Sequence, residues 1–203
     1  MVGRPRTVSD DEILDGALVV LSRVGPQGLT LGAVAAEVGL RAPTVSQRFG
    51  SKRDLLLALS ARAVAQVPVR FAAARGRHRS AVAAMLAALG EFVVGVDSPA
   101  AMGHRVAFLA MDLADLDLRR LAAAHGAAVA GEIETALGHA VGAGELAELG
   151  EGRTAALARA VHTAYNGSLI TWAVDGQGSL GQWISSDIGA VLAPYVKGRS
   201  AHA

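Results

Sequence analysis

Apolar residues recur at intervals of three and four positions along most of the chain, which is the period of an amphipathic α-helix. Segments that alternate between apolar and polar positions, the pattern of a half-buried strand, are nearly missing. Alanine and leucine, both good helix formers, fill many positions. The pattern therefore predicts an all-α fold of about nine helices.

A capping box predicts where the first helix begins. In the run SDDE, Glu12 follows Ser9 by three residues, so each side chain can accept the backbone N–H of the other residue. The apolar stripe continues to about Val24, where Gly25 and Pro26 interrupt the helical pattern. The first helix is therefore expected to end near Val24.

Three further helix starts are predicted in the next stretch of the chain. Thr30 is expected to cap a short second helix that ends at Gly39, and a third helix is predicted over about 42–49. Ser51 opens the fourth helix in a second capping box. Pro68 is expected to end or kink this helix, because proline lacks a backbone N–H and its ring crowds the preceding turn.

The rest of the chain is predicted to form longer helices. Helical spacing continues from Val82 to Val96, and the run DSPAAM starts another helix that is expected to reach about Met111. Further helices are predicted over about 112–141, 153–175 and 180–196. With 203 residues, the chain is long enough for one large or two small domains.

The second and third helices meet three packing requirements of a helix-turn-helix. Ala35 is small where the two helices meet, Gly39 can adopt a positive φ in the turn, and Val45 can bury the inner face of the third helix. These spacings therefore predict a helix-turn-helix.

With Val45 pointing inward, the 100° step of a helix leaves the opposite side of the third helix for a DNA major groove. Gln47 can pair with an adenine edge, Ala42 and Pro43 can touch thymine methyls, and Arg41 can reach guanine or phosphate. Taken one at a time, the same residues also fit an ordinary solvated surface. The full set of predicted DNA-binding residues is Thr30, Arg41, Ala42, Pro43, Thr44, Ser46, Gln47 and Lys52.

The basic residues gather locally, although 19 basic and 18 acidic residues give a net charge of only +1. One cluster is the arm GRPR at residues 3–6, and the other comprises Arg41, Arg48, Lys52 and Arg53. The arm is similar to the Arg-Pro core of minor-groove AT-hooks, and a merely solubilising terminus is the other interpretation.

Residues 9–59, centred on LTLGAVAAEVGLRAPTVSQRFGSKRDLLLAL, resemble the N-terminal domain of the TetR family of bacterial transcriptional regulators. The matching features are the Thr30 helix start, the Ala35 and Gly39 pair, Thr44-Val45 and the run FGSKRDLL. Two positions depart from the family pattern, since Ser46 replaces the usual Tyr and Arg41 the usual Ser or Thr cap.

The resemblance implies a homodimer that binds a double-stranded DNA operator. It implies a DNA-binding domain over 1–50 and, over 51–203, a helical domain that holds a small effector and dimerises through its last two helices. Thr30, Thr44 and Lys52 match phosphate-contacting positions of the family, and residues 41–43 with Gln47 match base-reading positions.

The second domain offers candidate residues for both roles. Large or polarisable side chains suited to a ligand pocket between helices are Met85, Phe92, Met102, Phe108, Met111, Tyr165 and Trp172. Apolar residues in excess of what the last two helices need for their own core predict the dimer interface, namely Leu169, Trp183, Ile184 and Val191.

Other classes of protein have little support in the sequence. Without cysteine the chain has no disulfide and no thiol nucleophile, and it lacks the common hydrolase, metalloprotease, P-loop and Rossmann motifs. His125, Glu132 and His139 recur every seven residues, which is too far apart to share one metal ion. We therefore expect no enzyme activity, no metal and no cofactor.

No membrane association is expected either. The longest weakly charged run, which starts at Ala81, is too short to span a bilayer and contains Glu91. The N-terminal residues have no apolar segment of an export signal, so the expected location is the cytoplasm.

The function predicted from these features is a ligand-responsive transcriptional regulator, in the form of a repressor that leaves its operator when a small apolar molecule binds the second domain. The alternative is a ligand-blind dimeric DNA-binding protein whose second domain only dimerises or binds a protein partner. An all-α enzyme with a vestigial motif is a remote third reading.

Overall fold

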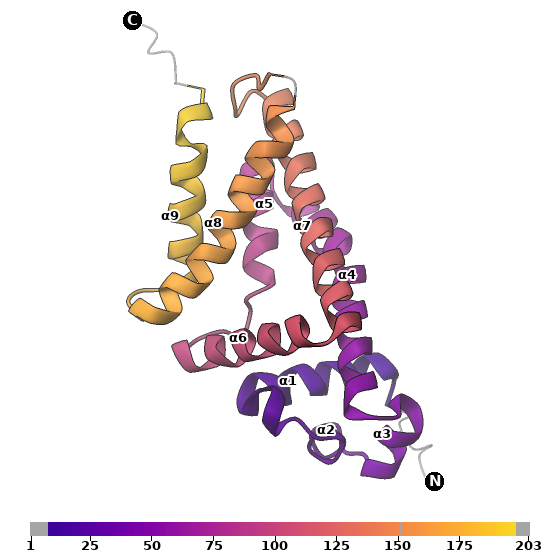
Figure 1. The fold of residues 1–203 in the computed structure, drawn as a ribbon. Helices are drawn as coiled ribbons and strands as arrows, with labels where there is room; N and C mark the ends of the chain where they lie inside the picture. The colour runs from indigo at the N-terminus through magenta and orange to yellow at the C-terminus, as the bar shows by residue number, and fades with distance from the viewer. Residues whose placement is uncertain (1–7, 151, 198–203) are drawn as a thin grey trace, which may run out of the picture. The chain divides into compact units, whose positions relative to one another are not determined.

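The computed structural model describes residues 8–150 and 152–197, and these residues fold into helices without a named strand (Figure 1). The element order confirms the all-α prediction and the expected number of helices. The helices are α1 (Asp10–Gly28), α2 (Leu31–Glu37), α3 (Ala42–Phe49), α4 (Lys52–Arg77), α5 (Ala81–Glu91), α6 (Pro99–Ala114), α7 (Leu116–Gly142), α8 (Arg153–Asp175) and α9 (Leu180–Leu192), followed by the 3₁₀ turn η1 (Ala193–Tyr195).

The first helix begins where the sequence predicts, but it continues to Gly28, and the break at Gly25 lies inside it rather than at its end. The Glu12 N–H donates to Ser9 Oγ over 3.1 Å and the Ser9 N–H donates to Glu12 Oε2 over 2.7 Å, which completes the capping box. Gly25 has a φ of 70° and separates two helical stretches within α1. A Cβ at Gly25 would lie 2.9 Å from Cδ2 of His104, so both the backbone angle and the available space require glycine.

Helix α4 runs past Pro68, and the helix after it is shorter than the sequence pattern predicts. Pro68 lies inside α4, which continues to Arg77, so it does not end the helix. The buried neighbours Val67 and Phe71 hold this part of α4 in a core, and packing offsets the missing hydrogen bond. The segment from Val82 to Val96 is helical only to Glu91.

The break between α6 and α7 falls at Asp115 and not after Met111, so Asp112 belongs to α6 and does not begin α7. The Asp115 carboxylate accepts the N–H groups of Asp117 over 3.0 Å and Leu118 over 3.2 Å, which satisfies the first turn of α7. The last helix ends at Leu192, and η1, which contains Pro194, continues it. Proline cannot donate the next helical hydrogen bond.

The chain divides into two compact units. Unit 1 comprises the described residues up to Ala63 together with Gly103–Ala122, and unit 2 comprises Val64–Met102 with the described residues from Ala123 onward. This grouping differs from a division at residue 50, because it joins the start of α4 and parts of α6 and α7 to the first three helices.

The core of unit 1 fixes the helix-turn-helix to α1 and to the start of α4. Residues Phe108 and Met111 pack against this core. Its buried members are Ile13, Leu14, Ala17, Val20, Leu21, Leu29, Val34, Ala35, Val45, Leu55, Leu56, Leu59 and Leu118. Burial of these apolar side chains is the main term that holds the short helices α2 and α3 in place.

The core of unit 2 is built from the second half of α4 and from α5, α7, α8 and α9. Its largest fully buried side chains include Phe71, Met85, Leu89, Ile133, Leu137 and Ile184. By length and composition alone α4 could cross a membrane. In the fold, however, its residues Leu55 and Leu59 are buried in unit 1 and Val67 and Phe71 in unit 2, so its apolar character is explained by the two cores.

One carboxyl group in unit 1 is buried without a hydrogen bond. Only 8% of Asp112 is exposed, and its Oδ1 has no hydrogen-bond partner among the described residues. Burial, and to a lesser extent the charge of Asp115, raises the pKa of Asp112 from 3.8 to about 6. Because the folded pKa lies above the unfolded value, the ionised group opposes folding above about pH 6 and ceases to do so below about pH 4.

We therefore expect Asp112→Asn to raise the free energy of unfolding at pH 8 by about 1 kcal/mol, within the range for relieving an unsatisfied buried group. The gain should disappear near pH 4, where the wild-type carboxyl is protonated. Urea unfolding of both proteins at the two pH values measures the difference. Exposed Asp11→Asn is the control, and an equal gain at both pH values would contradict the assignment.

Candidate nucleic-acid interface

The turn between α2 and α3 is held by backbone geometry and local hydrogen bonds. The Ala33 N–H donates to Thr30 Oγ1 over 3.0 Å, which caps α2 as predicted. Gly39 has a φ of 69°, and the next N–H, that of Leu40, donates to the Ala35 carbonyl over 2.8 Å. No atom lies within 4 Å of a Cβ built on Gly39, so the positive φ alone is the reason for glycine there.

The inner face of α3 is anchored by one buried side chain. Val45 is 0% exposed and Ala35, on α2, is 1% exposed, and both belong to the core of unit 1. The predicted packing of the two short helices is confirmed. Because Val45 fixes the rotation of α3 about its axis, it also fixes which residues face outward.

Most of the predicted DNA-binding residues are exposed on α3 or directly before it. Arg41, Ala42, Pro43, Thr44, Ser46 and Gln47 are all exposed, and so is Thr30 at the start of α2. Ser46 donates its hydroxyl to the Gly50 carbonyl over 3.2 Å, so that hydroxyl is already engaged. Lys52 is half-buried, and its Nζ donates to the Gln27 carbonyl over 3.2 Å.

Arg41 lies directly before α3 and makes no side-chain capping bond, but its carbonyl accepts the Thr44 N–H over 3.0 Å. The departure of Arg41 from a Ser or Thr cap does not move the helix start, which is Ala42 as predicted. Pro43 at the first turn suits this start because its missing N–H has no intrahelical partner there.

Two of the four clustered cations are neutralised within unit 1. Arg48 donates through Nε to Asp10 Oδ1 over 2.7 Å and through Nη1 to the Val8 carbonyl over 2.6 Å. Arg53 is paired with acids of the α6–α7 turn. Among the residues that the structure describes, Arg41 and Lys52 form no ion pair, so they carry the available positive charge of this face.

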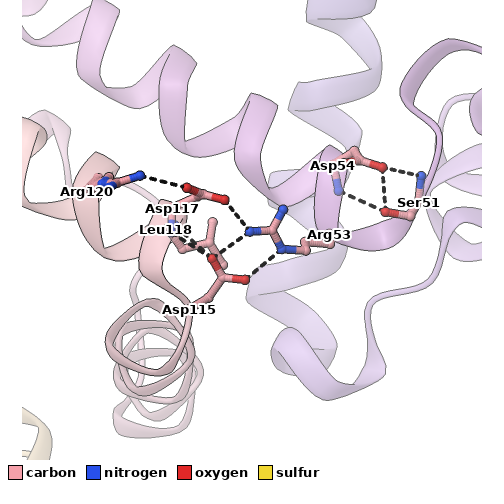
Figure 2. A network of polar contacts seen from close by, with 7 residues as sticks. All are labelled: Ser51, Arg53, Asp54, Asp115, Asp117, Leu118 and Arg120. Carbon is pink, nitrogen blue, oxygen red and sulfur yellow. Dashed lines mark hydrogen bonds and ion pairs between the residues drawn. The ribbon is translucent and has the colours of Figure 1, made fainter.

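Figure 2 shows the contacts of Arg53. Its Nε and Nη2 donate to the two carboxylate oxygens of Asp115 over 2.7 and 2.9 Å, and Nη2 also donates to Asp117 over 2.7 Å. Hydrogen bonds from Arg53 and from the Leu118 N–H lower the pKa of Asp115 to about 2. The start of α4, one helix after α3, is thereby tied to the turn between α6 and α7.

A second polar pair closes the start of α4. Ser51 donates its hydroxyl to Asp54 Oδ2 over 2.6 Å, and the Asp54 N–H donates to Ser51 Oγ over 3.2 Å. These bonds lower the pKa of Asp54, so this capping box is charged at neutral pH. The Asp54 carboxylate also accepts the Ser51 N–H over 3.0 Å.

The ion pairs of Arg53 with Asp115 and Asp117, called the arginine bridge below, are not predictable from the sequence pattern, because Arg53 and Asp115 are 62 positions apart. In the sequence, Asp112, Asp115 and Asp117 form a local cluster of acids. Their roles differ in the fold: Asp115 and Asp117 accept from Arg53, whereas Asp112 is buried on α6.

The predicted ligand-binding residues do not come together in one cluster. Met85, Met102, Tyr165 and Trp172 are buried in the core of unit 2, and Phe92 packs half-buried against it. Phe108 and Met111 pack against the core of unit 1 instead. A sequence stripe identifies an apolar face but does not reveal which core covers it.

The predicted dimer residues differ in how far their side chains are buried in the protomer. Ile184 is 2% exposed and belongs to the protomer core, whereas Leu169, Trp183 and Val191 are half-buried. The Trp183 indole donates to the Gln177 carbonyl over 2.8 Å. Ile184 is therefore not part of an exposed face.

Two other sequence features are the basic arm at residues 3–6 and the spaced series His125, Glu132 and His139. The arm at residues 3–6 lies outside the described residues. Across 8–150 and 152–197, no group of three or more His, Asp and Glu side chains is arranged to hold a metal ion. His125 packs edge-on against Phe92, and Glu132 pairs with Arg75 over 2.7 Å, so these two residues have structural contacts of their own.

Comparison with known proteins gives matches at two levels. Residues 13–59 match the family model described as bacterial regulatory proteins, tetR family. An uncharacterized HTH-type transcriptional regulator of Mycobacterium tuberculosis is 35% identical over 63 residues, which are 31% of this chain and 29% of that protein. The chain thus matches less than a third of the length of this relative.

The fold as a whole is similar to solved structures. SmeT, the repressor of the Stenotrophomonas maltophilia multidrug efflux pump SmeDEF, aligns with a TM-score of 0.65 at 19% identity over 94% of this chain and 92% of that chain. The transcriptional regulator FadR from Bacillus subtilis, in complex with stearoyl-CoA, aligns with a TM-score of 0.67 at 16% identity over 91% and 98%. At these identities the likeness shows the fold alone.

The arginine bridge leads to a pKa prediction. Because Arg53 lowers the pKa of Asp115, its favourable contribution is present above about pH 4 and is lost as the pH falls toward 2. In Arg53→Gln we expect the pKa of Asp115 to return toward 3.8, measured by NMR titration of its carboxyl carbon. Arg120→Gln is the control, because Arg120 pairs with Asp117 and not with Asp115. An unchanged Asp115 midpoint in Arg53→Gln would disprove the bridge in solution.

Proposed function

Because the chain belongs to the tetR family of bacterial regulatory proteins, we propose that it binds double-stranded operator DNA through α3 and regulates transcription as a repressor. The observation that carries this proposal is the exposed set at 41–44, 46 and 47, held outward by the buried Val45. A short helix presented in this way fits a major groove.

Base reading is assigned to the exposed side chains of α3. The Gln47 amide has the donor and acceptor that an adenine edge requires, and the small apolar surfaces of Ala42 and Pro43 suit thymine methyl groups. Arg41 has no carboxylate partner among the described residues, so its guanidinium is available for a guanine edge or a phosphate.

Phosphate contacts are assigned to Thr30, Thr44 and Lys52, which lie at the start of α2, on α3 and at the start of α4. Lys52 uses one of its three N–H donors on the Gln27 carbonyl and retains two for a phosphate. Ser46 lacks the reach of the tyrosine that is usual in the family, so we expect fewer phosphate contacts per half-site.

A homodimer is proposed through the outward faces of α8 and α9. Small or apolar exposed residues follow each other along both helices, so two copies can approach closely as a four-helix arrangement. They are Ala156, Ala160, Gly167, Ile170 and Val174 on α8 and Gly181, Ser185, Gly189 and Ala190 on α9. Leu169, Trp183 and Val191 are half-buried and border these faces.

Release of DNA by a small apolar effector is proposed for unit 2. Among the predicted ligand residues packed against this core, Phe92 is the one that stays partly exposed. Its ring lies beside the Arg70 guanidinium at 5.4 Å and the His125 ring at 5.6 Å, which supplies polar groups around an apolar surface. The stearoyl-CoA complex of FadR supports a ligand role for this fold.

The bridge of Arg53 is proposed as the connection between effector and DNA. Both α6 and α7 extend from unit 1 into unit 2, and the turn between them holds Arg53 at the start of α4. A shift of that turn moves α4 and changes the spacing of two α3 helices, which must match grooves about 34 Å apart or a multiple of that distance.

One observation favours the ligand-blind alternative: most of the predicted ligand residues in unit 2 are used for packing inside its core. Met85, Met102, Tyr165 and Trp172 are buried in the core of unit 2, and the indole of Trp172 donates to the Gly178 carbonyl over 3.1 Å. Compounds screened for release of bound DNA distinguish the two functions. We propose no catalytic activity, no cofactor, no membrane association and a cytoplasmic location where DNA is accessible.

DNA binding is tested by selecting bound sites from random DNA and measuring affinities at several salt concentrations. We expect Gln47→Ala to lose about 1–3 kcal/mol of discrimination at one base pair. Lys52→Ala should weaken all sequences alike and reduce the salt slope by about one. Failure of the wild-type chain to enrich any sequence at moderate salt would overturn the proposal.

Two arginines beside α3 provide a matched pair of variants. Arg41→Gln should lower affinity about ten-fold, because its charge is available to DNA. Arg48→Gln should change affinity less than about two-fold, because Arg48 already pairs with Asp10. Equal losses in both variants would contradict the proposed division of charge.

The dimer is tested on exposed residues, because a charge at the buried Ile184 would unfold the protomer. Ile170 is 48% and Val174 is 85% exposed, so Ile170→Glu with Val174→Glu should leave the fold intact and give monomers on a sizing column with light scattering. Val94→Glu, at a valine that is 76% exposed and lies outside α8 and α9, is the control and should remain dimeric. A dimer in the double variant would exclude this face.

A further inference from the structure

We propose that unit 2 has a binding site for the phosphate group of a small molecule, at a shallow pocket where the ends of α4, α5 and α7 meet. The cavity has a volume of about 200 Å³. This site is separate from the DNA-binding residues and from the predicted effector residues. Its lining residues are Arg75, His78, Arg79, Ala81, Ala84, His139, Ala143 and Glu145.

Nitrogen donors dominate the polar lining. The run RGRHRS places Arg75, His78 and Arg79 around the end of α4, and His139 adds a fourth donor from the end of α7. Arg79 is exposed and forms no ion pair with a carboxylate in the described part of the chain. Arg75 is bound to Glu132 through a single nitrogen, Nη1, over 2.7 Å.

Glu145 is the acidic residue of this pocket, and its carboxylate accepts hydrogen bonds from the start of α5. Its Oε1 accepts the Ala81 N–H over 2.7 Å, and its Oε2 accepts the Ser80 hydroxyl over 2.6 Å and the Val82 N–H over 3.2 Å. Burial opposes its ionisation, but these hydrogen bonds prevail and lower the pKa of Glu145. The carboxylate therefore compensates the α5 terminus, and Arg79 has no carboxylate partner among the described residues.

The donor set favours phosphate over other ligands. Guanidinium groups bind phosphate oxygens with two parallel hydrogen bonds, and histidine supplies a further N–H. Two arginines beside the histidines oppose binding of a metal cation. The cavity is smaller than the about 300–1,000 Å³ of pockets for drug-sized ligands, so it suits inorganic phosphate or a small phosphate ester.

The test is isothermal titration of the full chain, without DNA, with inorganic phosphate and in parallel with glycerol 3-phosphate. We expect saturable binding at one site per protomer and a loss of about ten-fold or more in affinity for Arg79→Gln. His139→Gln provides a second variant from another helix with an expected loss in the same direction. Tighter binding of the ester would identify an organic phosphate as the ligand, and equal binding would identify the free ion.

Arg77→Gln is the matched control. Arg77 belongs to the same basic run but pairs with Glu91 and does not line the pocket, so its variant should bind phosphate like the wild type. Absence of saturable binding, or equal affinity in the wild type, Arg79→Gln and His139→Gln, would overturn the site. Because no DNA is present, either result is independent of whether the chain binds an operator.

Discussion

Burial of Val45 is the constraint on which the candidate interface depends. Helix α3 has only eight residues, and a helix of that length is not stable in water without packing. The side chain of Val45, fully buried with Ala35 in the core of unit 1, supplies the packing and sets the rotation of the helix. The outward direction of Gln47 and its neighbours follows from that one contact and from the 100° step.

The usefulness of each cation depends on whether an acid lies within reach of it. Four basic residues cluster in the sequence at 41, 48, 52 and 53, yet Arg48 is held by Asp10 and Arg53 by Asp115 and Asp117. These two arginines order unit 1, and of the four cations Arg41 and Lys52 have no ion-pair partner in the described part of the chain. The same principle applies in unit 2, where Arg77 is paired with Glu91 and Arg79 has no ion-pair partner among the described residues.

Features set within a few residues of each other were predictable from the sequence, and features set across the fold were not. The capping box of Ser9, the positive φ of Gly39 and the start of α3 each depend on local backbone chemistry. The partner of Arg53 depends on a contact across 62 positions. Trp172 on α8 and Ile184 on α9 were recognisable as apolar positions, but their burial in the protomer core depends on which helices cover them.

The carboxyl groups of Asp112 and Asp115 lie three positions apart and respond to acid in opposite ways. Burial raises the pKa of Asp112 to about 6, whereas Arg53 lowers that of Asp115 to about 2. As the pH falls from 6 to 4, protonation of Asp112 removes a term that opposes folding, and below 4 protonation of Asp115 removes a favourable one. The joint contribution of the two groups to stability is therefore greatest near pH 4. At neutral pH, Asp115 is paired with Arg53, whereas the charge of Asp112, three positions earlier, has no partner among the described residues. The α6–α7 turn therefore joins a charge whose ion pair stabilises the fold to a charge whose burial opposes folding.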